Sequence, residues 1–133
     1  MLKVVDHIGI AVPNIEEALK FWATGLQIEV THREEVASQK VKTAFLPIGD
    51  TNIELLEPTS EDSPIAKAME KRGPGIHHLC FEVADIHAAL KHLTAQGMTL
   101  INHEPVPGAH GKLVAFVHPK STGGILIELS QKM

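Results

Sequence analysis

The stretch DHIGIAVPNIEEALKF at residues 6–21 returns later in the chain as HHLCFEVADIHAALKH at residues 77–92. His7 and His78 stand at matching points of the two stretches, at an offset of 71 positions, and Val12 and Val83 keep the same offset. Self-similarity at a fixed offset is the signature of a duplicated supersecondary unit. The sequence therefore predicts two copies of one fold module.

Each copy closes on an Ile-Glu-Leu triplet, at residues 53–55 and 127–129. The two glutamates lie 74 positions apart because the second copy has three extra residues in segment 119–124. Imidazole nitrogens and carboxylate oxygens are ordinary ligands of divalent metals. The repeat therefore predicts one metal ion at a pseudo-twofold axis, with four ligands: His7, Glu54, His78 and Glu128.

The hydrophobic pattern divides the first copy into one helix and several strands. Residues 3–12 alternate as a strand does, and Asn14 followed by Glu17 forms a capping box for a helix that ends near Gly25. Three further strands are predicted at residues 27–34, 40–47 and 51–57. The first copy is thus predicted to be β-α-β-β-β. A connector helix starts at Ser63-Pro64 and ends at Gly73.

The second copy repeats this order. A strand at residues 76–83 precedes a helix capped by Asp85 that ends near Gly97, and strands follow at 99–104, 112–118 and 124–130. The glycine-rich run at 108–112 lacks the spacing of a phosphate-binding loop.

These elements predict an α+β fold in a single domain, residues 1–133. Two tandem βαβββ modules, at about 1–58 and 75–133, flank a connector at about 59–74. Together they would form a curved eight-stranded mixed sheet around a metal-containing cavity, with the helices on its convex side.

Strand alternation decides which way the candidate ligands point. Leu79, Phe81 and Val83 fall on one face of their strand, so His78 falls on the other. Each candidate glutamate is likewise flanked by Ile and Leu. All four candidates are therefore predicted to project from the face opposite the apolar core. Any one of them alone would more simply be a solvent-facing polar residue, but the same coincidence in both copies favours a shared site.

Composition excludes several classes of function. The chain is 44% apolar with a formal charge of −4 and no long Lys/Arg run, so a nucleic-acid partner is not expected. No apolar stretch approaches the roughly 20 residues of a membrane span, and the first residues show no basic leader. The single cysteine, Cys80, permits no internal disulfide and fits a reducing compartment. A cytoplasmic location without membrane contact is expected.

With these motifs in place, the chain resembles the vicinal oxygen chelate superfamily over essentially its whole length. That superfamily, which includes glyoxalase I and the extradiol dioxygenases, pairs β-α-β-β-β modules around a divalent metal. Within it the chain is most similar to the methylmalonyl-CoA epimerases. Five stretches carry this likeness: DHIGIAV (6–12), HREE (32–35), EDSPIAK (61–67), GPGIHHLCFEV (73–83) and HPKSTGGILIEL (118–129).

The resemblance implies an isomerase that epimerises methylmalonyl-CoA at C2, by proton abstraction and return through a metal-stabilised enolate. It places the metal ligands on His7, Glu54, His78 and Glu128, with His77 as a competitor for His78 that strand alternation disfavours. It also implies an acyl-CoA substrate and a homodimer. The metal stays open among Zn, Co, Mn, Ni and Fe.

The identity of the two bases is a separate question. Family members with glutamine as the remaining metal ligand carry an additional acid on the third strand, where this chain has Thr43 beside Lys42. We therefore predict that Glu54 and Glu128 are the two catalytic bases, with Lys42 as an alternative. Two other functions stay open at this point: a glyoxalase I-type lyase acting on a glutathione hemithioacetal, and a non-catalytic small-molecule-binding relative.

Overall fold

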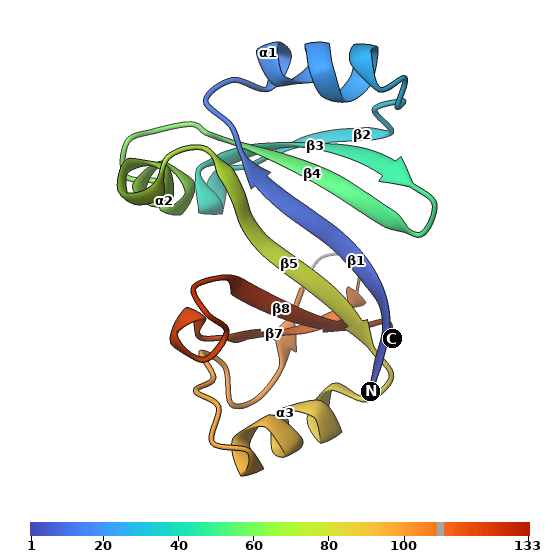
Figure 1. Ribbon diagram of the computed structural model, residues 1–133, viewed down its shortest axis with the longest axis vertical. Helices are drawn as coiled ribbons and strands as arrows, with labels where there is room; N and C mark the ends of the chain where they lie inside the picture. Colours follow the sequence, from blue (N-terminus) through green and yellow to red (C-terminus); the bar gives the residue numbers. More distant parts are fainter. Residues whose placement is uncertain (109–110) are drawn as a thin grey trace. The chain divides into compact units, whose positions relative to one another are not determined.

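The computed structural model describes residues 1–108 and 111–133 (Figure 1), so part of the glycine-rich run at 108–112 lies outside the described residues. The helices are α1 (Ile15–Leu19), which continues as the π-helical turn η1 (Lys20–Gly25), α2 (Pro64–Arg72) and α3 (Ile86–Ala95). Short 3-10 turns are η2 (Ala37–Gln39) and η4 (Pro119–Ser121). The strands are β1 (Leu2–Ala11), β2 (His32–Val36), β3 (Val41–Ile48), β4 (Thr51–Pro58), β5 (Gly75–Val83), β6 (Val106–Pro107), β7 (Leu113–Val117) and β8 (Leu126–Gln131).

The order β-α-β-β-β thus occurs twice, as the repeat predicts. The strands follow the order β2-β3-β4-β1-β5-β8-β7-β6 in an eight-stranded sheet. The sheet is mixed, because β1 pairs with β4 and β5 with β8 in parallel, whereas β2, β3, β6 and β7 pair antiparallel. The predicted eight-stranded mixed sheet is confirmed. By internal contacts the chain divides into two compact units, residues 7–77 and residues 1–6 with 78–133.

In the unit of residues 7–77, helices lie on both faces of the strands. One face packs against α1 and η1, and its buried side chains include Leu19, Ile53 and Leu55. On the other face Ile65 of α2 packs against Ala11 and Leu56. Since successive strand residues point to opposite faces, Glu54 shares the α2 face with Leu56.

The described residues of the unit formed by 1–6 and 78–133 share one large apolar cluster. Helix α3 packs on β5, β7 and β8 through a core in which Ile86 and Ala115 are fully buried. Phe81 and Leu129 belong to the same cluster, so His78 and Glu128 alternate to the opposite face. The prediction that the candidate ligands oppose the apolar core therefore agrees with the structure for His78 and Glu128. For Glu54 it holds only with respect to the cluster beneath α1, because the α2 face that Glu54 shares carries a second buried apolar cluster.

The first helix of each copy is tied to the last strand of that copy by the same contact. Glu57 Oε1 accepts a hydrogen bond from the backbone N–H of Ile15 at 2.8 Å, and Gln131 Oε1 accepts one from Ile86 at 2.7 Å. Each bond satisfies an N–H that the helix start leaves without an intrahelical partner. The duplication therefore extends to the way each helix is anchored. Both predicted N-caps are also confirmed: Asn14 and Asp85.

Two predicted strands are wrong in position. The chain after η1 turns at Gln27, where φ is 59°, and becomes a strand only at His32, not at residue 27. Residues 99–104 form no continuous strand: Leu100 makes one isolated bridge to Val117, and the Asn102 side chain accepts the backbone N–H of Phe116. The Asn102 side chain thus accepts a hydrogen bond that a backbone carbonyl would accept in a regular pair of strands. Prolines next to and within β6 also keep it short, because proline donates no ladder hydrogen bond.

Within the part of the chain that the structure describes, no helix has the length and apolar character that crossing a membrane requires.

Candidate metal centre

The first pair of candidate ligands comes from two parallel neighbours, β1 and β4. His7 Nε2 lies 3.6 Å from Glu54 Oε2, and both side chains are 14% exposed. In the strand register Glu54 lies opposite Gly9, not opposite His7. Because glycine has no side chain, Gly9 places no side-chain atoms beside the Glu54 carboxylate, which lies near the His7 imidazole. We call His7 and Glu54 the first half-site.

The second pair repeats this arrangement on β5 and β8. His78 Nε2 lies 3.8 Å from Glu128 Oε1, with side chains 11% and 14% exposed. Here Glu128 lies opposite Cys80, which is buried and whose Sγ is 3.5 Å from the hydroxyl of Ser130. We call His78 and Glu128 the second half-site.

The two half-sites agree in donor type, separation and exposure. They also share a feature that the sequence reasoning missed, since a small residue stands opposite the glutamate in each: Gly9 in one copy and Cys80 in the other. These positions keep the same offset of 71 as the histidines, so the repeat itself carried the signal. The two copies therefore repeat the same local geometry.

The separations within each half-site can be compared with those of two ligands of one ion. Two atoms each about 2.1 Å from a metal, at tetrahedral or octahedral angles, lie roughly 3.0–3.5 Å apart. The distances of 3.6 and 3.8 Å are slightly above that range. Each half-site offers one nitrogen and one carboxylate, which is two donors short of a closed four-coordinate site. The donor set suits Zn, Co, Mn, Ni and Fe, all of which accept mixed nitrogen and oxygen ligands.

The residues near the predicted acid position on β3 have other roles. Thr43 is buried on the same face as Glu54, and its hydroxyl donates a hydrogen bond to the Glu34 carbonyl at 3.2 Å. Lys42 is exposed and pairs with Glu57 in the strand register, so it alternates to the face opposite Glu54. Neither residue presents an acid or base beside the first half-site.

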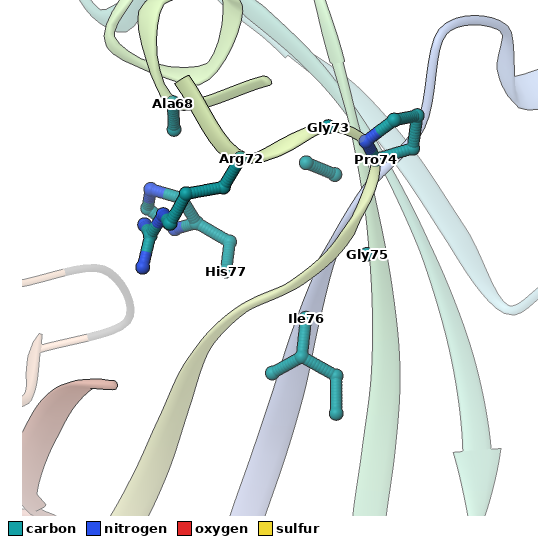
Figure 2. A pocket seen from close by; sticks show the side chains of 8 residues that line it. Ala68, Arg72, Gly73, Pro74, Gly75, Ile76 and His77 are labelled. Atoms are coloured by element: carbon teal, nitrogen blue, oxygen red, sulfur yellow. The ribbon is translucent and has the colours of Figure 1, made fainter. Parts of the chain in front are cut away.

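His77 lies in a different setting from its neighbour His78. It lines a pocket of about 110 Å³ beside the end of α2, together with Ala68, Arg72, Ala11 and segment 73–76. Figure 2 shows the side chains of Arg72 and His77 on the same side of this pocket. Burial lowers the pKa of His77, and the positive charge of Arg72 lowers it further. His77 is therefore held in its neutral form at neutral pH.

The chain is similar in sequence to proteins of a known superfamily. Residues 6–116 match the model of the Glyoxalase/Bleomycin resistance protein/Dioxygenase superfamily. The ethylmalonyl-CoA/methylmalonyl-CoA epimerase of Cereibacter sphaeroides is 42% identical over 133 residues, which is 98% of this chain and 99% of that protein. The human mitochondrial methylmalonyl-CoA epimerase is 40% identical over 128 residues, which is 96% of this chain and 73% of that protein.

The chain is also similar to solved structures of such enzymes. A Streptomyces coelicolor methylmalonyl-CoA epimerase in complex with 2-nitronate-propionyl-CoA superposes with a TM-score of 0.88. It is 36% identical, and the alignment covers 99% of this chain and 96% of that one. The alignment therefore spans nearly the whole chain, so both copies of the repeat lie within it.

Proposed function

Because the chain belongs to the Glyoxalase/Bleomycin resistance protein/Dioxygenase superfamily, and because its full-length relatives are methylmalonyl-CoA epimerases, we propose that it epimerises methylmalonyl-CoA at C2. The protein would then be an isomerase with an acyl-CoA substrate. The observation that carries the proposal is the pair of matched half-sites, each with one imidazole and one carboxylate, in a chain that aligns end to end with these enzymes.

The proposed cofactor is one divalent metal ion with His7, Glu54, His78 and Glu128 as its ligands. Its support is the incompleteness of each half-site alone, together with their equal donor types and separations. When bound, the metal supplies a positive charge that favours the enolate form of the substrate thioester.

The residues of the chain must move the proton. The C2 hydrogen lies between a thioester and a carboxylate, and inversion requires one group to remove it and another to return a proton from the opposite side. We assign these roles to Glu54 and Glu128. Their place in opposite copies of the repeat supports the assignment, as do the hydrogen-bonded hydroxyl of Thr43 and the placement of Lys42 on the other face.

Assembly and compartment complete the proposal. We expect a homodimer, which would cover some of the large apolar side chains exposed in the described part of the chain, among them Leu2, Phe21 and Leu26. A reducing cytoplasmic compartment suits a chain whose single thiol, Cys80, is buried.

Deuterium exchange tests the proposed activity. Incubation of the metal-loaded protein with (2R)- or (2S)-methylmalonyl-CoA in deuterated water should give both epimers labelled at C2, and a chelator should abolish the labelling. The glyoxalase alternative predicts turnover of a glutathione hemithioacetal instead. Absence of metal-dependent exchange at C2 from both epimers would reject the epimerase.

A further inference from the structure

We propose that the pocket at the end of α2, lined by Arg72 and His77, binds a phosphate group of the substrate's CoA moiety. We call it the α2 pocket. This inference rests on the proposed function, because it assigns a part of the same substrate to a second place in the chain. It concerns only residues within the unit of residues 7–77.

The chemistry of the lining favours an anion. Of the eight residues that line the α2 pocket, two carry side-chain N–H donors, Arg72 and His77, and none is a carboxylate. Arginine binds phosphate through parallel N–H bonds and stays charged at any working pH. Ala68 lies four residues before Arg72 on α2, so both present the same helix face to the pocket.

The backbone leaves room for a ligand to approach. Gly73 and Gly75 have φ values of 77° and 142°, and a Cβ added at either would meet nothing within 4 Å. In Figure 2 segment 73–76 runs along the side of the pocket away from Arg72 and His77. The two glycines therefore add no side chain to this wall of the pocket.

The size of the α2 pocket selects what enters it. A volume of about 110 Å³ is well below the roughly 300–1,000 Å³ of a site that encloses a whole drug-sized ligand. It equals the liquid volume of three to four waters at about 30 Å³ each. One phosphate group fits this space.

The position of the α2 pocket matches the length of the CoA arm. Ala11 lines the pocket and lies four residues after His7 on β1, on the same strand face. At about 3.3 Å per residue that separation is roughly 13 Å. The pantetheine arm has about a dozen bonds of near 1.5 Å between sulfur and the first phosphorus, so it spans roughly 15 Å when extended. A thioester near His7 could therefore place a phosphate in the pocket.

The test measures two variants with two substrates. One variant changes the charge of the pocket and the other changes its volume. Arg72→Gln removes the charge, and Ala68→Leu fills the pocket without changing charge. For methylmalonyl-CoA we expect Arg72→Gln to raise KM about tenfold, the loss typical of one charge-assisted hydrogen bond. Ala68→Leu should raise KM by about the same factor, because its larger side chain occupies the space of the phosphate, and kcat should be unchanged in both variants. For methylmalonyl-pantetheine, which has no phosphate, KM should equal that of the wild type. Lys71→Gln is the matched control, because it removes the same charge one residue earlier and Lys71 does not line the pocket.

Each outcome decides the proposal. Unchanged KM for methylmalonyl-CoA in Arg72→Gln and Ala68→Leu overturns it, and so does an equal rise for both substrates, which would mark a structural effect. Inorganic pyrophosphate should compete with methylmalonyl-CoA in the wild type and about tenfold more weakly in Arg72→Gln. If the wild type binds inorganic phosphate while both variants keep normal KM, the pocket serves a free anion and the CoA assignment is wrong. A wild type that does not epimerise refutes the proposed function itself.

Discussion

Replacing Glu54 by Gln should lower the rate of epimerisation by about 100- to 10,000-fold, the contribution typical of a positioned general base. The substitution keeps the size of the side chain and an oxygen that can still bind a metal, as amide oxygens do in other sites. The measurement is kcat for the metal-loaded variant, with bound metal determined on the same sample. Glu128→Gln should show a loss of similar size, because Glu128 holds the same place in the second half-site.

Isotope exchange sharpens this prediction. If each glutamate serves one side of C2, each variant should still exchange the C2 proton of one epimer with deuterium while losing inversion. Glu54→Gln and Glu128→Gln should then retain exchange for different epimers, one for (2R)- and the other for (2S)-methylmalonyl-CoA. The control is Glu35→Gln, which alters an exposed glutamate on β2 and should leave kcat unchanged. A Glu54→Gln variant that epimerises at the full rate with metal bound would remove Glu54 from the mechanism.

His7→Ala and His78→Ala should each weaken metal binding at least about 100-fold, since loss of an outer-shell partner alone typically costs 10- to 100-fold in affinity. The two losses should be similar, because the half-sites match in separation and exposure. Activity without added metal should disappear in both. Competition with a metal-binding dye gives the affinities.

His77→Ala is the decisive control for this pair of variants. It removes the histidine next to His78, which lines the α2 pocket, and should leave metal affinity within about twofold of the wild type. If His77→Ala instead loses the metal while His78→Ala retains it, the choice made by strand alternation is wrong. A large loss in His7→Ala with none in His78→Ala would assign the metal to the first half-site alone.

Much of this architecture was readable from the sequence because the chain repeats itself. The offset of 71 between His7 and His78 predicted the double β-α-β-β-β order, and period-two alternation predicted the faces from which Glu54 and Glu128 project. Both signals can be read from the sequence itself. A repeat shows which residues occupy equivalent positions in the two copies, and the alternation of a strand shows which of its residues share a face. They do not depend on knowing how distant segments pack.

The features that could not be predicted depend on contacts between distant segments. Segment 99–104 alternates like a strand, yet Asn102 bonds to the backbone of Phe116 in place of a ladder. The proximity of Glu54 to His7 depends on the strand register, in which Glu54 lies opposite Gly9, and this register comes from the pairing of two strands that are distant in the sequence. The α2 pocket likewise joins residues from β1, α2 and β5.

The central claim is that two copies of the repeat act on one metal ion, and the number of ions per chain tests it most directly. Native mass spectrometry of the protein, titrated with Co or Zn, should show binding that saturates at one ion per chain, and both His7→Ala and His78→Ala should lower that occupancy. Saturation at two ions per chain, with each histidine variant losing only one of them, would contradict the claim, because each half-site would then bind its own metal.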